Sequence, residues 1–246
     1  MEKFMTGDAM KLFGRISLML SAIALSAGAA LAGPYEDGEA AAKRGDYTEA
    51  AKQYRLAAEQ GNPKGQSHFG DMYYWGLGGI EIDKVEAARL YRLAADQGDA
   101  FGESMLASMY LEGDPRAIPR NYTEALRLFR LAAAQGHSPA QLYIGQMYEN
   151  GQGVREDYNE AIKWYRLAAE QKHPSAFLAL GKMYQNGRGV LQDYVLAHMW
   201  YNLASINHPG AVYERDSLAK QMTPEQIAEA QKLAQECQRR NFKDCG

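Results

Sequence analysis

A short phrase, Arg-Leu-Ala-Ala, occurs four times in this chain, and its spacing constrains the fold more than any other feature. The copies begin at Arg55, Arg92, Arg130 and Arg166, and a degenerate fifth copy begins at Asn202, so the spacings are 37, 38, 36 and 36 residues. A fixed period of this length is typical of a solenoid, in which each unit buries its apolar face against the next. Because solenoids usually present surfaces for binding, the period predicts the architecture more closely than it predicts a partner.

Each period also contains the signals of a helix that carries this phrase. An Asp or Asn precedes each copy, and in four of the five copies a Glu follows it three residues later, which predicts an N-cap in a capping-box-like arrangement. The predicted N-caps are Asp46, Asp83, Asn121, Asp157 and Asp193. An aromatic residue follows each cap by eight residues and is predicted to lie in the core: Tyr54, Tyr91, Phe129, Tyr165 and Tyr201. Glycines at 61, 98 and 136 are predicted to end these helices.

A second helix in each period is indicated by a recurrent Met-Tyr pair with a small residue three positions before the tyrosine. The small residues are Gly70, Ala107, Gly145 and Gly181. A glycine inside a helix costs up to about 1 kcal/mol relative to alanine, so its recurrence predicts that the paired helix approaches closely at this position. Prolines at 63, 139, 174 and 209 are predicted to begin these helices, where a missing N–H does no harm.

Taken together, these residues resemble the Sel-1-like repeat (SLR) family, a relative of the tetratricopeptide repeats. The similarity is most specific over residues 140–169, and the loops Gly151–Val154 and Gly187–Val190 match the family pattern, whereas Leu111–Pro119 departs from it with an insertion. The resemblance covers about residues 35–220. It implies an all-α fold, a right-handed α-α superhelix of about five to six helix-turn-helix repeats with a C-terminal capping helix.

The repeat pattern divides the chain into segments. Residues 33–61 are predicted to form an N-terminal capping helix pair, and residues 62–207 four repeats, at about 62–98, 99–136, 137–172 and 173–207. Residues 208–246 are predicted to hold a degenerate repeat and a capping helix that begins at Thr223 and Pro224. Such a cap shields the open end of a solenoid from solvent.

Residues 1–32 have the pattern of a secretory signal peptide. Lys11 and Arg15 precede an uncharged run of 17 residues, which ends in the small-x-small sequence Ala30-Leu31-Ala32 that signal peptidase accepts. We therefore expect cleavage between Ala32 and Gly33, and a periplasmic or secreted protein without stable membrane insertion after cleavage. The alternative is an uncleaved anchor, although the run is shorter than the roughly 20 apolar residues that span a bilayer. Met1 and Met10 both remain possible starts.

The two cysteines of the chain, Cys237 and Cys245, lie close to its end. An even pair in an exported protein predicts a disulfide, with two free thiols as the alternative. In a continuous helix these residues would be about 12 Å apart. Because a disulfide needs Cα atoms within about 7 Å, the last helix is expected to end near Arg240 and the tail to fold back.

Composition and motifs argue against several function classes. The net charge is −3 and the chain has no block of Lys or Arg, which disfavours a nucleic-acid partner. No cofactor or metal is expected, since the recurrent His137, His173 and His208 would lie one helix pair apart. Ser217 and Lys220 fit the Ser-x-x-Lys pattern of penicillin-interacting enzymes, but the Lys-Thr-Gly element is missing. Some cysteine-rich relatives carry a β-lactamase label, which leaves a β-lactam-binding or hydrolysing enzyme as an alternative.

The resemblance implies a non-enzymatic adaptor whose first helices line a concave binding face. By position relative to the small residue of each repeat, the expected binding residues are Ser67, Asp71, Tyr74, Ser104, Ser108, Glu112, Leu142, Gln146, Glu149, Asn150, Leu178, Lys182 and Gln185. This set has no strong charge of either sign, which favours another protein or a peptide as the partner. A peptidoglycan-associated structural protein is the second alternative.

Overall fold

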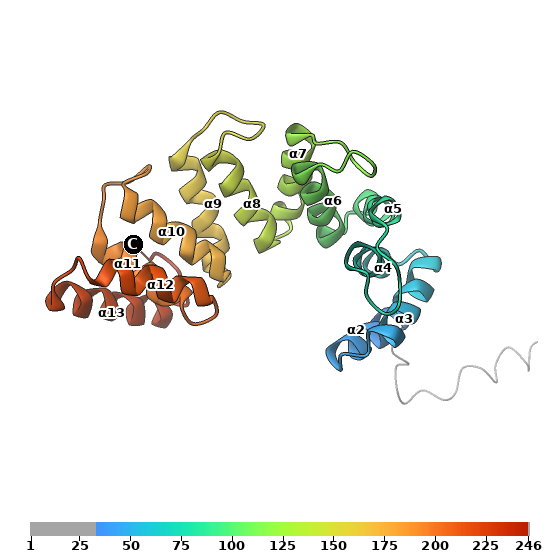
Figure 1. Cartoon of the computed structure of the whole chain (residues 1–246), viewed down its shortest axis with the longest axis horizontal. Coiled ribbons are helices and arrows are strands. Elements are labelled where there is room, and N and C mark those ends of the chain that lie inside the picture. Colours follow the sequence, from blue (N-terminus) through green and yellow to red (C-terminus); the bar gives the residue numbers. More distant parts are fainter. Residues whose placement is uncertain (1–32, 246) are drawn as a thin grey trace, which may run out of the picture.

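The computed structural model describes residues 33–245, which form twelve α-helices and no β-strand. The helices are α2 (Pro34–Lys43), α3 (Tyr47–Glu59), α4 (Pro63–Trp75), α5 (Lys84–Asp96), α6 (Ala100–Glu112), α7 (Tyr122–Ala134), α8 (Ser138–Glu149), α9 (Tyr158–Glu170), α10 (Pro174–Asn186), α11 (Tyr194–Ala204), α12 (Pro209–Ala219) and α13 (Pro224–Arg239). Successive helix pairs follow one another around an arch (Figure 1). The predicted all-α superhelix is confirmed, whereas the predicted signal peptide lies outside the described residues.

The second helix of each pair begins where the sequence predicts. All five expected N-caps accept a hydrogen bond from a backbone N–H in the first turn, for example Asp157 Oδ1 from Glu160 N at 3.0 Å. The capping-box expectation is wrong for the glutamates, because they turn outward to a cation three residues later. Glu86 Oε1, for instance, lies 2.6 Å from Arg89 Nη2. Thr223 and Gln226 make a complete capping box at the start of α13.

The core is built from the recurrent aromatic residues, as predicted. Tyr91, Phe129, Tyr165 and Tyr201 are fully buried, and apolar clusters follow one another along the solenoid. The small residue of the first helix lies against the aromatic ring: a Cβ added at Gly145 would be 2.5 Å from Tyr165 Cε1. The repeated glycine is therefore explained by the close approach of the two helices.

The ends of the second helices need a left-handed residue. The glycines at 61, 98 and 136 have φ values of 81°, 79° and 83°, which confirms them as helix stops. Lys172 stands at the equivalent position after α9 and has a φ of 64° without being a glycine. This turn therefore carries backbone strain that the glycine turns avoid.

The C-terminal end is closed by α12, α13 and a disulfide. Both helices pack on α11. The helix α13 ends at Arg239, and the chain then folds back so that Cys237 and Cys245 are bonded, with Cα atoms 5.3 Å apart. The returning segment places the ring of Phe242 5.3 Å from that of Phe177 in the core. The disulfide and the fold-back that the sequence predicts are both present. Among the described helices, none is long and apolar enough to cross a membrane.

Candidate functional site

The first helices form the inner side of the arch. In Figure 1, α4 and α6 lie nearer the centre of the arch than α5 and α7. First helices of neighbouring units also contact one another, α2 with α4 and α4 with α6, as expected on the inside of a curve. The expected binding residues belong to these first helices.

Five of the expected residues meet in one groove of about 410 Å³ on this face, between α8, α10 and the start of α12. We call it the inner groove, and its lining residues are Gln146, Glu149, Asn150, Tyr165, Ser175, Leu178, Ala179, Lys182 and His208. Among these, Gln146, Glu149, Asn150, Leu178 and Lys182 are expected binding residues. Polar groups from the end of α8 therefore face an apolar and a basic residue on α10.

Glu149 is the most firmly held polar group of the inner groove. Tyr165 Oη donates to Glu149 Oε2 at 2.6 Å, and Arg188 Nη1 donates to Glu149 Oε1 at 3.3 Å. Burial raises the pKa of Tyr165, and its hydrogen bond to Glu149 raises it further, so the hydroxyl stays protonated and remains a donor. The carboxylate is thus fixed by a core residue on one side and by a cation of the next repeat on the other.

The remaining polar groups of the groove are less restrained. Lys182 Nζ lies 3.9 Å from Glu214 Oε1 on α12, and the Lys182 side chain is half exposed. An exposed ion pair at this distance contributes little, so the ammonium group can bind another acceptor. Asn150 Nδ2 donates to Gln146 O at 2.9 Å. With Leu178 and Ala179 beside these groups, the groove offers donors, an acceptor and an apolar surface to the same ligand.

Three of the expected binding residues are buried, and for these the prediction is wrong. Ser67 and Ser104 are 0% and 3% exposed, and Leu142 belongs to the core at 7%. Ser67 Oγ donates to Lys64 O in its own helix. They point into the contact between helices, so none of the three presents a side chain to a partner in this structure.

The other expected residues lie on or near the inner side but take part in contacts within the solenoid. Asp71 Oδ1 and Gln185 Oε1 each accept a hydrogen bond from a core tyrosine, Tyr91 and Tyr201, at 2.5 Å. Tyr74 Oη donates to Glu112 Oε2 at 3.1 Å and so links α4 to α6. Ser108 Oγ donates to the backbone of its own helix. These side chains stabilise the packing of the helices that carry them.

Ser175, Ala179 and His208 line the inner groove but were not among the expected binding residues, and Tyr165 was expected only in the core. Ser175 and Ala179 share a face of α10 with Leu178 and Lys182, because residues three and four apart lie side by side on a helix. The helical period could therefore have found them. His208 is the N-cap of α12 and comes from the next unit, so only the packing of the units brings it to the groove.

The residues considered for other chemistry do not form a site. No group of three or more His, Cys, Asp and Glu within residues 33–245 could hold a metal ion. His137, His173 and His208 are the N-caps of three successive first helices. Ser217 lies near the end of α12 and Lys220 is its C-cap. No hydrogen bond joins their side chains in the described structure.

The chain is similar to one protein family and to several proteins of known structure. The model of the Sel1 repeat matches residues 26–62, 63–99, 100–137, 138–173 and 174–207. A Sel1 repeat protein from Oxalobacter formigenes is similar to 94% of this chain and 98% of its own length, with 26% identity and a TM-score of 0.67. No protein of curated function matches.

Two further solved structures share the fold at lower identity. A putative sel1 repeat protein from Klebsiella pneumoniae is 21% identical over 76% of this chain and 91% of its own, with a TM-score of 0.54. The immunity protein Pa5087 from Pseudomonas aeruginosa is 20% identical over 86% of this chain and 81% of its own, with a TM-score of 0.55. Similarity at this level shows the solenoid architecture alone.

Proposed function

Because this chain belongs to the Sel1 repeat family, we propose that it is a non-enzymatic adaptor that binds a segment of another protein in the inner groove. Members of this family are generally scaffolds for protein–protein interaction and are typically not enzymes. The observation that carries the proposal is the convergence of Gln146, Glu149, Asn150, Leu178 and Lys182 on one groove. These residues come from two repeats, and Gln146, Glu149 and Lys182 differ from the residues at equivalent positions elsewhere in the chain.

The chemistry of the inner groove suits a polypeptide segment. Lys182 and Glu149 supply charges of opposite sign, and the amides of Gln146 and Asn150 can pair with backbone groups of a peptide. Leu178 supplies an apolar contact for a side chain. A polyanion would instead require a surplus of basic residues, which this face does not have.

We also propose that the adaptor is exported. The pattern of residues 1–32 supports this location, and the bond between Cys237 and Cys245 suits an oxidising compartment. N-terminal sequencing of the protein recovered from the periplasm or medium of an expressing bacterium tests it. The expected first residue is Gly33, and a product that keeps residues 1–32 contradicts the proposal.

Photo-crosslinking in cells tests the inner groove. A photo-reactive phenylalanine analogue is placed at Gln146, and a control probe at Leu167, an exposed residue of α9 that does not line this groove. We expect one protein adduct from position 146 and none from 167, and loss of that adduct when Lys182→Glu reverses the charge in the groove. Equal labelling from both probes, or labelling from neither, contradicts binding in the inner groove. In the latter case, co-sedimentation with peptidoglycan distinguishes a wall-binding protein.

A further inference from the structure

A recurrent hydrogen bond crosses the outer face of the solenoid between successive units. At three junctions, the arginine of the Arg-Leu-Ala-Ala phrase donates to the hydroxyl of a tyrosine 18 residues later, on the first helix of the next unit. The Nη2–Oη distances are 3.2 Å for Arg92 and Tyr110, 2.9 Å for Arg130 and Tyr148, and 2.8 Å for Arg166 and Tyr184. At each of these junctions an arginine side chain therefore reaches from one second helix to the following first helix.

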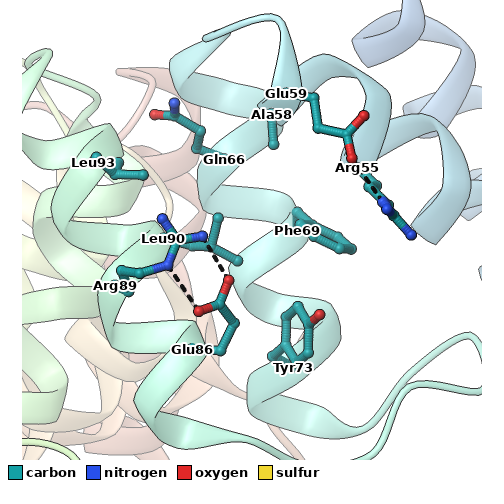
Figure 2. Close-up of a pocket in the computed structure, with 10 residues that line it drawn as sticks. All are labelled: Arg55, Ala58, Glu59, Gln66, Phe69, Tyr73, Glu86, Arg89, Leu90 and Leu93. Atoms are coloured by element: carbon teal, nitrogen blue, oxygen red, sulfur yellow. Dashed lines mark hydrogen bonds and ion pairs between the residues drawn. The ribbon is translucent and has the colours of Figure 1, made fainter.

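The first junction has the same two residues but lacks this contact. Arg55 Nε donates instead to Glu59 Oε1, at 2.8 Å, within its own helix α3. The hydroxyl of Tyr73, 18 residues after Arg55, forms no hydrogen bond with any group in residues 33–245. A groove of about 460 Å³ lies here between α3, α4 and α5 (Figure 2), and we call it the outer groove.

The outer groove combines an aromatic floor with charged walls. The rings of Phe69 and Tyr73 are 5.1 Å apart and lie between the two walls in Figure 2. One wall carries the Arg55–Glu59 pair, and the other carries Glu86, which accepts two hydrogen bonds from Arg89 at 2.6 and 2.8 Å. Two cations and two anions balance, so the groove has no net charge that would favour a purely acidic or purely basic ligand at long range.

The next junction along the chain shows what such a groove holds. There, Glu124 is bound by Arg127 as Glu86 is bound by Arg89, and Tyr110 stands at the position of Tyr73. The pKa of Glu124 is lowered chiefly by its hydrogen bond to Arg127, and also by the charge of Arg92. The Arg92 guanidinium therefore lies near both the tyrosine hydroxyl and this carboxylate. The outer groove presents the same two groups, Tyr73 and Glu86, with its own arginine turned away.

We propose that the outer groove binds an arginine side chain of another polypeptide, in the position that Arg92 takes in the following groove. The guanidinium donates to Tyr73 Oη and lies beside Glu86, which suits a planar group with five donors. Leu93, 39% exposed, offers an apolar contact for the residue next to that arginine. Arg55 is the competing ligand inside the chain, and its hydrogen bond to Glu59 keeps its guanidinium on the wall of the groove instead of on Tyr73 Oη.

A pair of short peptides tests the charge and the site together. The probes are acetyl-Ala-Leu-Arg-Leu-Ala-amide and the same peptide with citrulline, which is neutral and of nearly the same shape. Binding to the ¹⁵N-labelled protein, residues 33–246, is followed by NMR. We expect the arginine peptide to shift amide signals around Tyr73 and to bind at least about tenfold more tightly than the citrulline peptide, because a hydrogen bond to a charged group is the stronger one. Equal affinity of the two peptides overturns the proposal.

Variants separate this binding from a general effect on the fold. Tyr73→Phe should weaken the arginine peptide several-fold, whereas Tyr110→Phe, the matched change in the next groove, should leave its affinity unchanged. Glu59→Ala should also weaken it, because Arg55 is then free to reach Tyr73, and Arg55→Ala added to Glu59→Ala should restore it. Equal effects of Tyr73→Phe and Tyr110→Phe, or no effect of Tyr73→Phe in a variant with an unchanged melting curve, contradict the site.

Discussion

The α8–α9 and α6–α7 helix pairs meet the same packing requirement with different residues. In the first pair Gly145 lies against Tyr165, whose hydroxyl donates to Glu149. In the second pair Ala107 and Phe129 take the equivalent positions, and both are fully buried. A buried hydroxyl needs an acceptor. The two helix pairs therefore differ at three positions together: the aromatic ring, the small residue opposite it, and the residue of the first helix that accepts from the hydroxyl.

This difference also decides where the solenoid presents polar groups. Glu149 reaches the inner groove because Tyr165 and Arg188 hold its carboxylate there. In α6, Leu111 stands at the position of Glu149, and no tyrosine hydroxyl is available behind it. A core residue, through its hydroxyl, therefore fixes a side chain of the candidate site.

The largest expected effect on stability comes from adding a side chain where α8 and α9 approach closely. Gly145→Val places a Cβ about 2.5 Å from Tyr165 Cε1, and overpacking of this kind typically costs 1–3 kcal/mol and at times more. We expect a loss of about 3 kcal/mol or more in the free energy of unfolding, measured by urea denaturation. Ala107→Val is the matched variant and should lose less, since the packing there already accommodates a Cβ. Equal losses contradict the explanation given for the glycine.

Most of the architecture could be predicted from the sequence, since it depends on local signals repeated at a fixed period. The N-caps, the buried aromatic residues and the glycine stops are examples, because each is decided within one helix. The Cys237–Cys245 bond followed from an even pair of cysteines in a chain with an export signal, and the fold-back of the tail followed from the length of a helix and the reach of a disulfide. These features needed no knowledge of how neighbouring units pack.

The candidate site was predicted only in part, for the opposite reason. Ser67 and Leu142 occupy the expected face of their helices, but contacts between helices cover them. The hydrogen-bond partner of Arg55 is likewise not decided within its own helix. Arg166 also has a glutamate, Glu170, four residues later, and yet it donates to Tyr184. Which side chain stays accessible is decided by the packing of units, and the repeat pattern carries no information on that.

A hydroxyl added to the α6–α7 pair tests the link between ring and acceptor. Phe129→Tyr buries a hydroxyl near Ser108 and Leu111, neither of which offers a carboxylate, and an unpaired buried polar group costs about 1–3 kcal/mol. Ser108 stands at the position of Asp71, which accepts from Tyr91 at 2.5 Å. Ser108→Asp should therefore recover part of the loss in the double variant. Urea denaturation of the four proteins gives the coupling energy, and a value near zero contradicts the comparison.

The smallest expected effect concerns the charge of the acceptor, which is a carboxylate in α4 and an amide in α10. The pKa of Asp71 is raised, chiefly by burial, while the hydrogen bond from Tyr91 and the charge of His68 oppose the rise. A raised pKa means that the folded state binds the proton more readily than the unfolded state. The contribution of Asp71 to the free energy of unfolding is therefore full below its pKa in the unfolded chain, about 3.9, and is lost as the pH rises through its pKa in the folded protein.

Asp71→Asn should remove this dependence, because an amide oxygen accepts from the tyrosine at every pH, as Gln185 does from Tyr201. The free energy of unfolding of the variant minus that of the unchanged protein should be larger at pH 7 than at pH 4, as measured by urea denaturation at both pH values. Gln185→Ala is the control, since it removes a neutral acceptor and should cost the same at both. A difference for Asp71→Asn that stays constant means that folding does not shift the pKa of this carboxyl group, and the two kinds of acceptor are then equivalent. A difference that changes in the opposite direction means that the folded state stabilises the carboxylate, so that the charge on α4 favours its packing.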